Sequence, residues 1–481
     1  MHLSVYLFLP FATASAISWS NCSSSLTPRL ECASLSVPIN WDDLSGPRTT
    51  IRLQRLPASN TSSRIGPLFY NPGGPGGVAT EFINATAQGY HLFSDTLLQH
   101  FDLVGVDPRG VGTSDPIRCD PIIANERVTF FPSTEAEFAT LVDYNRRLSE
   151  SCSNLTGPLF EYMDTASVAR DMEAVRQALG GEQISWFGQS YGSQMAVAHA
   201  ELFPDTIRAM VLDGNVDHSQ AESSNMLTES STYERELERF ANWCAVNATC
   251  ALHGSDVLSV FDDLVRTADI TPIPAPDCVV SETCRVNVTG EELRFNVQDF
   301  LTFKEPISII GNIGWAGLAE ALNQTLHGDA STLSSSLSTS EIDDTRFAGQ
   351  AVLCQDWTHY TDTSFIDLAD KQIMGKAISP HTQGASQTWT EVGCVGWTAP
   401  VRNPPHYASI NASIPTLLVN AMYDPETSIV WANGLKAQIP GALLATRNGD
   451  GHTSYLLFGE TSKATDEYLV SLSISQLMFS S

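Results

Sequence analysis

Short, mostly apolar runs recur along the chain, each bounded on at least one side by glycine, proline or aspartate. Five of them lie at 67–70, 103–106, 184–187, 209–212 and 416–419. Short runs with such boundaries are typical of strands that are buried on both faces of a sheet. We therefore predict that these segments form the central strands of one sheet.

Between two of these runs the spacing changes to that of a helix. Its recurring positions are Thr165, Val168, Ala169, Met172, Val175 and Leu179. This spacing places them on one face of a helix, which Asp164 can cap at its start and Gly180–Gly181 can end. A strand, a helix and a strand in succession predict a parallel sheet.

Between Gly214 and about Pro400 the pattern changes to polar helical stretches. This part contains a Ser/Thr-rich segment at 330–340 and four cysteines between Cys244 and Cys284. Strand-like runs return after it. We interpret it as a large, mainly helical cap inserted into a mostly parallel α/β sheet that is flanked by helices.

The predicted organisation has four parts, namely a signal peptide at 1–16, a first core segment at 17–213, the cap at 214–400 and a second core segment at 401–481. A chain of 481 residues exceeds what one hydrophobic core usually holds, so its length predicts either a main domain with a large insertion or two domains.

The start of the chain predicts secretion. Leu3–Phe11 is mostly apolar but too short to span a bilayer, and it leads into Ala14-Ser15-Ala16, a small-x-small cleavage pattern. No later stretch is long and apolar enough for a membrane span. We therefore expect a secreted, extracellular protein without a membrane anchor.

Cysteines and glycosylation sequons agree with that compartment. The ten cysteines have no Cys-x-x-Cys spacing, which favours disulfides over zinc or a redox pair. Close pairs that can form short loops are Cys22/Cys32, Cys244/Cys250 and Cys278/Cys284. Candidate glycosylation sites are Asn21, Asn60, Asn84, Asn154, Asn247, Asn287, Asn323 and Asn411.

Charge excludes one class of partner. The chain has 26 Lys and Arg residues against 54 Asp and Glu residues, a formal net charge of −28. A nucleic acid partner requires a basic surface, so we expect none. The oligomeric state is not predicted by these patterns.

A Gly-x-Ser-x-Gly motif occupies the turn between a predicted strand and a predicted helix. It is Gly188-Gln189-Ser190-Tyr191-Gly192, after the run at 184–187 and before an apolar helical stretch at 193–202. This is the context that a nucleophile elbow requires, because side chains at the two glycine positions would collide with neighbouring backbone. We therefore predict that Ser190 is a catalytic nucleophile.

Two backbone amides are candidates for an oxyanion hole. The amide of Tyr191 lies at the start of a helix, where it can stabilise a negative oxygen. The glycine run Asn71–Gly77 follows the strand at 67–70, where hydrolases with such an elbow place the second donor. We predict Gly74 as that donor.

The nucleophile needs an acid and a histidine that follow it in that order along the chain. Asp424 comes directly after the strand-like run at 416–419 and its neighbours, at the strand end that suits a carboxylate. Of eleven histidines, His452 alone follows Asp424, and it lies in a glycine-rich loop after a predicted strand at 443–446. We therefore predict Asp424 as the orienting acid and His452 as the general base.

Other motifs add little chemistry. Arg109, in Asp107–Gly112, is a candidate for substrate contact, although an ion pair that braces loops is the favoured alternative. Neither a His-Glu-x-x-His motif nor clustered Cys and His residues suggest a metal, and no Gly-x-Gly-x-x-Gly opens a helix. We expect no metal and no cofactor.

These residues resemble a known family, the secreted tripeptidyl-aminopeptidase-like branch of the α/β-hydrolases, which is related to prolyl iminopeptidases. The matching segments are Asn71–Gly77, Asp107–Ser114, Gly188–Gly192, Val211–Gly214, Ala351–Asp356 and Cys394–Trp397. The resemblance covers most of the mature chain. It implies the α/β-hydrolase fold, the triad of Ser190, Asp424 and His452, and a disulfide between Cys354 and Cys394.

The resemblance also implies release of tripeptides or single residues from a free amino terminus. Such activity requires carboxylates that hold the ammonium group at a fixed distance from the nucleophile. Candidates are Asp356, Glu222 and Glu229, each with a surface or capping role as the alternative. Two departures from the family pattern, Val78–Ala79 and Thr427–Ser428, bear on substrate preference.

Other functions fit the same residues. A triad of this kind cleaves esters as well as amides, so a carboxylesterase or a tailoring hydrolase for a small secreted metabolite is the main alternative. A serine carboxypeptidase shares the glycine run and the elbow, but Asp107–Ser114 and the Asp-Pro at Asp424 favour the aminopeptidase. A non-catalytic binding protein would lack a triad member. The expected partner is a peptide or a small ester or amide substrate.

Overall fold

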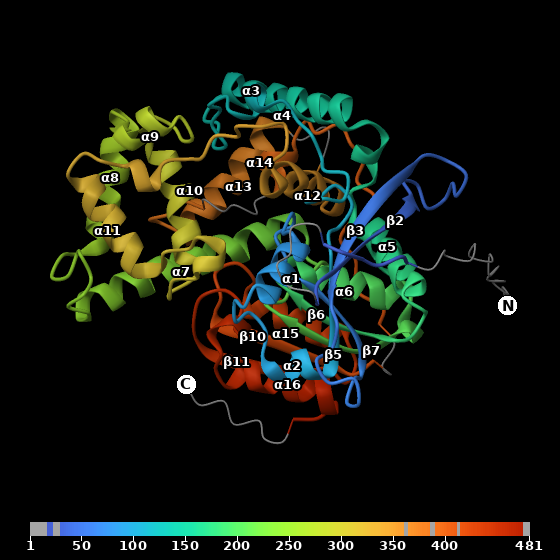
Figure 1. Cartoon of the computed structure of the whole chain (residues 1–481). Coiled ribbons are helices and arrows are strands. Elements are labelled where there is room, and N and C mark those ends of the chain that lie inside the picture. Colours follow the sequence, from blue (N-terminus) through green and yellow to red (C-terminus); the bar gives the residue numbers. More distant parts are fainter. Residues whose placement is uncertain (1–16, 23–28, 360–363, 385–389, 411–413, 475–481) are drawn as a thin grey trace, which may run out of the picture.

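The computed structural model describes residues 17–22, 29–359, 364–384, 390–410 and 414–474 (Figure 1). The predicted signal peptide at 1–16 and the sequon at Asn411 lie outside the described residues. Within them, no helix is both long and apolar enough to cross a membrane.

Nine strands of the described chain form one sheet in the order β1-β2-β3-β5-β4-β6-β7-β10-β11. Their bounds are β1 Ser20–Asn21, β2 Glu31–Pro38, β3 Arg48–Leu56, β4 Gly66–Asn71, β5 Phe101–Val106, β6 Ile184–Gln189, β7 Ile207–Asp213, β10 Thr416–Tyr423 and β11 Leu443–Asp450. The pairs from β5 to β11 are parallel, and those from β1 to β5 are antiparallel. Each predicted run lies inside one of the parallel strands, so the predicted mostly parallel sheet is confirmed.

The sheet is covered on both faces. Successive residues of one strand belong to opposite apolar clusters, as Val104 and Leu103 of β5 do. Helices α5 and α6 contribute to the first cluster, and α1, α2 and α16 contribute to the second. Two covered faces explain why the strands read as continuous apolar runs.

The helices of the sheet domain include the one that was predicted in detail. They are α1 Ala79–Ala87, α2 Asp95–His100, α3 Pro121–Ala124, α4 Glu135–Thr156, α5 Thr165–Ala178, α6 Tyr191–Leu202, α15 Ile429–Gln438 and α16 Glu460–Ser471. The Asp164 carboxylate accepts a hydrogen bond from the Ser167 amide at the start of α5, 2.8 Å away. Gly180 and Gly181 follow its end with positive φ angles of 113° and 80°. The predicted cap and stop signals are both present.

The inserted helices form a group beside the sheet domain (Figure 1). They are α7 Glu222–Val246, α8 Val257–Ile270, α9 Pro276–Ser281, α10 Gly290–Leu301 and α11 Gly314–Leu326, with a short antiparallel pair β8 Ile273–Pro274 and β9 Asn287–Val288. They share an apolar cluster of their own, which runs from Leu237 to Leu333. This group lies within residues 214–400, where the polar helical pattern predicts the cap.

The last part of the predicted cap packs differently. It contains a π-helical turn, η5 Asp344–Ala348, and the helices α12 Gly349–Asp356, α13 Phe365–Ile378 and α14 Thr390–Cys394. Phe347, Cys354 and Trp397 belong to the apolar cluster of the sheet domain rather than to that of the cap. By packing, η5, α12 and Trp397 therefore belong with the sheet domain, whereas Leu368 of α13 clusters with Leu141 of α4 and with Met226 of α7.

All ten cysteines are paired in disulfides. The pairs are Cys22–Cys32, Cys119–Cys152, Cys244–Cys250, Cys278–Cys284 and Cys354–Cys394. Four were anticipated, three from their close spacing and Cys354–Cys394 from the family resemblance. Cys119–Cys152 was not anticipated, because 33 residues separate its members.

Candidate active site

Ser190 lies at a sharp turn between β6 and α6. Its backbone has a φ of 55° and a ψ of −127°. Residues other than glycine rarely adopt this region of backbone angles. The turn requires the flanking glycines, because a Cβ atom at Gly188 would lie 2.3 Å from the Gly192 oxygen and one at Gly192 would lie 2.6 Å from the Asn71 oxygen. The Ser190 amide donates to the Asp213 carbonyl at 2.9 Å. The side chain is thereby presented at the carboxyl edge of the sheet.

The glycine run after β4 passes directly beside this serine. A Cβ atom at Gly73 would lie 2.6 Å from the Ser190 Cβ and 3.1 Å from its Oγ. The Gly73 amide donates to the Asn71 side chain and the Gly77 amide donates to the Gly73 carbonyl. No hydrogen bond from the Gly74 or the Tyr191 amide to another protein group is present among the described residues outside regular helix and strand pairing, and both amides stay the candidate oxyanion donors.

Asp424 and His452 are brought together by the ends of adjacent strands β10 and β11. The imidazole Nδ1 lies 2.9 and 3.0 Å from the two carboxylate oxygens of Asp424. This hydrogen bond places the proton on Nδ1 and leaves Nε2 as an acceptor. The Asp424 carboxylate, 2% exposed, also accepts from the Glu426, Thr427 and Thr453 amides and from the Thr427 hydroxyl. Its orientation is therefore held by several donors at once.

Two charged groups, a partly buried arginine and a buried aspartate, hold the backbone around His452. The Arg447 guanidinium donates to the carbonyls of Asp450, Gly451 and Thr453, each at 3.0 Å. The Asp213 carboxylate accepts from the Ser454 and Tyr455 amides, both at 2.9 Å. Arg447 binds carbonyls of the loop that carries the imidazole, and Asp213 binds its amides. These hydrogen bonds give the loop a defined position.

The end of β7 links the serine to the histidine. The Asp213 backbone carbonyl accepts a hydrogen bond from the Ser190 amide. The next residue is Gly214, and a Cβ atom added there would lie 3.1 Å from the His452 Cε1. In the described structure the Ser190 hydroxyl and the imidazole are not hydrogen-bonded to each other. Hydrogen bonds of this kind often tighten only when substrate binds.

The electrostatic environment favours the charged form of His452. Burial alone lowers its pKa, but the negative charge and hydrogen bond of Asp424, with the charges of Glu426 and Asp213, outweigh burial and leave the pKa raised. These carboxylates stabilise the imidazolium that forms when the ring accepts a proton.

We expect activity to be lost on acidification at a higher pH than an isolated histidine would give. Only neutral His452 can accept a proton, and its pKa is raised above the usual value of about 6.5. A pH profile of kcat/KM should therefore have an acidic limb with its midpoint above about 6.5. A midpoint below about 6 would contradict a role for this imidazole as base.

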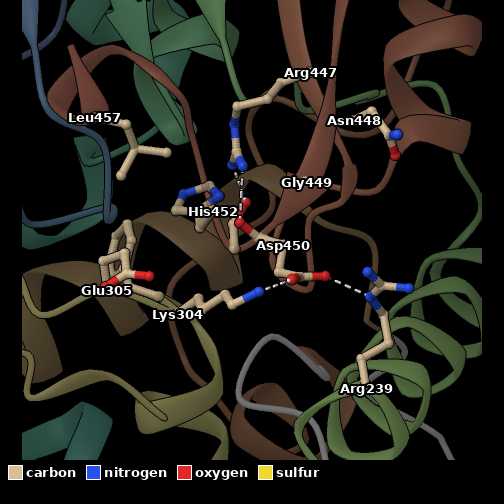
Figure 2. Close-up of a pocket in the computed structure, with 11 residues that line it drawn as sticks. Arg239, Lys304, Glu305, Arg447, Asn448, Gly449, Asp450, His452 and Leu457 are labelled. Carbon is tan, nitrogen blue, oxygen red and sulfur yellow. Dashed lines mark hydrogen bonds and ion pairs between the residues drawn. The ribbon is translucent and has the colours of Figure 1, made fainter. Parts of the chain in front are cut away.

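A pocket of about 370 Å³ lies beside His452 (Figure 2). Its cap wall contains Arg239 of α7 and the segment Phe303–Glu305, and the Phe303 ring lies 6.0 Å from the imidazole ring. Figure 2 shows Lys304 and Arg239 reaching Asp450 from opposite sides, at 2.8 and 2.5 Å. The cap therefore reaches the histidine loop through ion pairs and shapes the space next to it.

Two residues proposed from sequence for substrate contact lie in the protein interior. The Arg109 side chain is 0% exposed, forms two hydrogen bonds of 2.7 Å with Asp171 and binds three backbone carbonyls. Asp356 is 1% exposed and accepts from the side chains of Thr165, Gln194 and Asn403, and burial raises its pKa to about 7. The polar atoms of both side chains are engaged by these protein groups, so the structure assigns Arg109 and Asp356 to bracing the interior.

The two glutamates proposed for the same role lie on α7. Glu229 is 0% exposed and lies on the helix segment that packs against the Asp424 loop, where the Thr232 hydroxyl donates to the Pro425 carbonyl at 2.9 Å. Glu222 is 9% exposed and pairs with Lys371 at 2.9 Å. Of the two, Glu229 lies nearer the Asp424 loop along the helix.

Several residues around the site were not predicted from sequence. They include Asp213, Arg447, Thr427 and Glu426, which accepts hydrogen bonds from the Tyr233 and Thr302 hydroxyls. Asp213 had a usable signal, because it directly follows a predicted strand, as a functional carboxylate often does. Arg447 had none, since its partners are backbone carbonyls. Among the described residues, no group of three or more His, Cys, Asp or Glu side chains is placed to hold a metal ion.

Two family models match the chain. One, described as alpha/beta hydrolase fold, matches residues 66–277, which include Ser190 and the glycine run. The other, described as TAP-like protein, matches residues 379–476, which include Asp424 and His452. The two matches thus divide the candidate site between them.

Three curated relatives are similar to the chain. "Serine protease Hip1" of Mycobacterium tuberculosis is 29% identical over 458 residues, covering 91% of this chain and 85% of the relative. "Carboxylesterase B" of Mycobacterium tuberculosis is 30% identical over 475 residues, covering 91% and 84%. "Tripeptidyl aminopeptidase" of Streptomyces lividans is 31% identical over 261 residues, covering 52% and 48%.

Proposed function

Because the chain belongs to the α/β-hydrolase family with a TAP-like carboxyl-terminal region and is a serine hydrolase, we propose that it is a secreted, exo-acting aminopeptidase. It releases tripeptides or single residues from peptide amino termini. The observation that carries the proposal is the hydrogen bond between His452 Nδ1 and Asp424 beside the strained turn at Ser190.

The proposed reaction is acyl transfer in two steps. The Ser190 hydroxyl attacks the scissile carbonyl while His452 Nε2 takes its proton, and the Asp424 carboxylate stabilises the resulting imidazolium. The Gly74 and Tyr191 amides donate to the carbonyl oxygen as it becomes negative. His452 then protonates the leaving amine, and an acyl-enzyme remains. Water, deprotonated by the same imidazole, releases the product.

Recognition of a free amino terminus is proposed to fall to Glu229. An exopeptidase holds the substrate ammonium group with a buried carboxylate, because that contact sets how many residues lie between the amino terminus and the nucleophile. Glu229 is buried on α7, next to the turn that packs on the Asp424 loop. Glu222 lies two helical turns away and is paired with Lys371, which makes it the weaker candidate.

Secretion is part of the proposal. Five disulfides are typical of proteins that fold in an oxidising compartment. Among the sequons, Asn21, Asn60 and Asn154 are exposed and are proposed as glycan acceptors. The sequon asparagines that are only partly exposed are Asn84, Asn247, Asn287 and Asn323.

A carboxylesterase or a tailoring hydrolase for a small secreted metabolite is the second candidate. It is favoured by the similarity to "Carboxylesterase B", which extends over 91% of the chain. The same serine, histidine and aspartate cleave esters as readily as amides, so the cap determines which substrate is used.

We expect chromogenic tripeptidyl and aminoacyl amides with free amino termini to be cleaved at least about 100-fold faster than their amino-blocked counterparts, because blocking removes the positive charge that positions the substrate. The comparison measures kcat/KM for both series beside short acyl esters. Equal rates on free and blocked amides would exclude the exopeptidase. Turnover of esters alone would favour the second candidate.

A matched pair of variants locates the recognition carboxylate. Glu229→Gln should raise KM for free-amino amides by about tenfold or more and leave short acyl esters nearly unchanged. Glu238→Gln changes an exposed glutamate of the same helix and should leave both unchanged. If Glu229→Gln changes KM equally for amides and esters, Glu229 does not bind the substrate amino terminus.

A further inference from the structure

A second cavity, separate from the pocket at His452, lies between the cap and the sheet domain. Its volume is about 670 Å³, within the size range of small-molecule sites. Residues of α10 form its cap wall, and residues of α4, η5 and α12 form the wall of the sheet domain. No residue lines both this cavity and the pocket at His452.

Three arginines from distant parts of the chain meet in this cavity, namely Arg127, Arg285 and Arg346. Arg127 and Arg285 both pair with one carboxylate, that of Glu292, each at 3.1 Å. Glu292 also accepts from the Thr289 amide at the start of α10. The Glu292 carboxylate thus pairs with two guanidinium groups and also accepts a hydrogen bond at the start of a helix.

Arg346 differs from the other two arginines in its partners. It forms no ion pair with a carboxylate of the described residues. Apart from a hydrogen bond to the Ala124 carbonyl, its contacts with Asn125, Ser338 and Tyr144 are all 3.4 Å long, near the limit of a hydrogen bond. A partly buried guanidinium without an anion gains most from an added carboxylate.

The other carboxylates of the cavity do not supply that anion. Glu126 is paired with Arg147 through both oxygens, and Asp269 is paired with Arg294. Glu291 accepts from the Thr129 hydroxyl and the Phe130 amide, and burial, with the charge of Glu292, raises its pKa.

Arginines gather in this cavity although the chain is acidic. Three arginines and four carboxylates line it, and two of those carboxylates, Glu126 and Asp269, are paired with arginines outside the lining. Burial, with the positive charges of Arg127 and Arg346, lowers the pKa of Arg285, as expected where cations crowd together.

Beside the arginines the cavity has an apolar wall. Phe130 and Phe295 line the cavity, are partly buried, and pack edge to face with ring centroids 5.8 Å apart. Phe347, the neighbour of Arg346, and Trp397 complete the wall and are 1% and 4% exposed. A cation next to aromatic rings suits a ligand that carries a carboxylate and an apolar or aromatic group.

We propose that this cavity is a second binding site and that its ligand is an organic carboxylate with an aromatic or apolar substituent. The carboxylate pairs with Arg346 and Arg285, and the substituent packs on Phe130 and Phe295. This site is distinct from the one proposed for hydrolysis, because the η5 segment separates them. Asp344 of that segment accepts from the Gly112 amide at 2.9 Å, and its carbonyl lies against Gly76, on the side of the glycine run.

The test is titration calorimetry on the full mature chain carrying Ser190→Ala, so that no probe is turned over. Phenylacetate is the probe, phenylacetamide tests the need for the charge, and acetate tests the need for the ring. We expect saturable binding of phenylacetate and at least about tenfold weaker binding of the other two. Absence of saturable binding, or equal binding of phenylacetamide, would overturn the proposal.

Variants place the binding in this cavity. Arg346→Gln should weaken phenylacetate binding by about tenfold or more, and Arg346→Lys should retain part of the affinity. Arg266→Gln is the control, because the Arg266 side chain is 68% exposed on α8 and, among the described residues, pairs with Asp263 alone. If thermal unfolding shows that Arg346→Gln does not fold, Arg285→Gln replaces it. Unchanged affinity in the folded variant would place the binding elsewhere and refute the site.

Discussion

Replacement of Ser190 by alanine is expected to lower kcat for the preferred substrate by about 10⁴- to 10⁶-fold and to change KM little. Alanine keeps the turn and removes the only atom that can form the acyl-enzyme. Substrate binding persists, because the glycine run and the cap are unchanged. Steady-state kinetics with purified protein, at concentrations high enough to detect the residual rate, measure the effect.

The matched control is Ser45→Ala, at an exposed serine in the turn between β2 and β3. It should leave kcat and KM at the values of the unmodified protein, with the same thermal unfolding midpoint. Retention of more than about a tenth of the activity by Ser190→Ala would assign the nucleophile to another residue.

Asp424→Asn is expected to lower kcat by about 10⁴-fold. The Asp424 carboxylate accepts a hydrogen from His452 Nδ1 and stabilises the imidazolium. An asparagine can turn its amide group toward Nδ1 as a donor, and the proton then moves to Nε2, which can no longer take the serine proton. The loss therefore arises from the wrong tautomer, in a protein that stays folded.

The pH profile separates this role from a merely structural one. Asp424 raises the pKa of His452 through its charge and its hydrogen bond. Removing the charge should lower that pKa, so the acidic limb of kcat/KM should move to lower pH in Asp424→Asn. A variant that loses activity with an unmoved acidic limb would show that Asp424 supports the fold and does not act on the imidazole.

Much of the sheet and of the site could be predicted, because the signals are local in the sequence. A strand that is buried on both faces must be apolar at successive positions, and the runs at 184–187 and 416–419 lie inside β6 and β10. The turn at Ser190 needs glycines on both sides for steric reasons, and those glycines are visible in the sequence. Chain order then reduced the choice of histidine to one.

The parts that could not be predicted depend on contacts between distant segments. The sequence makes Arg109 a candidate for substrate contact. In the structure it binds Asp171, which lies 62 residues away in the sequence. Asp356 occurs in a matching motif, but its donors come from Thr165, Gln194 and Asn403. A motif records that a residue is used and does not say whether its side chain faces a substrate or the interior.

The second cavity also could not be predicted, because distant segments form it. Arg127, Arg285 and Arg346 are separated by more than sixty residues from one another, and no spacing rule connects them. The boundary of the cap was also hidden, because polar helical spacing continues through α12 while the apolar side of that helix packs against the sheet domain. Only the folded chain relates such segments.

The attachment site of a fluorophosphonate tests the assignment of the nucleophile most directly. Such reagents form a stable bond with a serine that an adjacent imidazole activates. Peptide mapping by mass spectrometry after labelling of the purified protein should find one adduct per molecule, on Ser190, and none in Ser190→Ala. An adduct on a different serine, or labelling that persists in Ser190→Ala, would contradict the assignment.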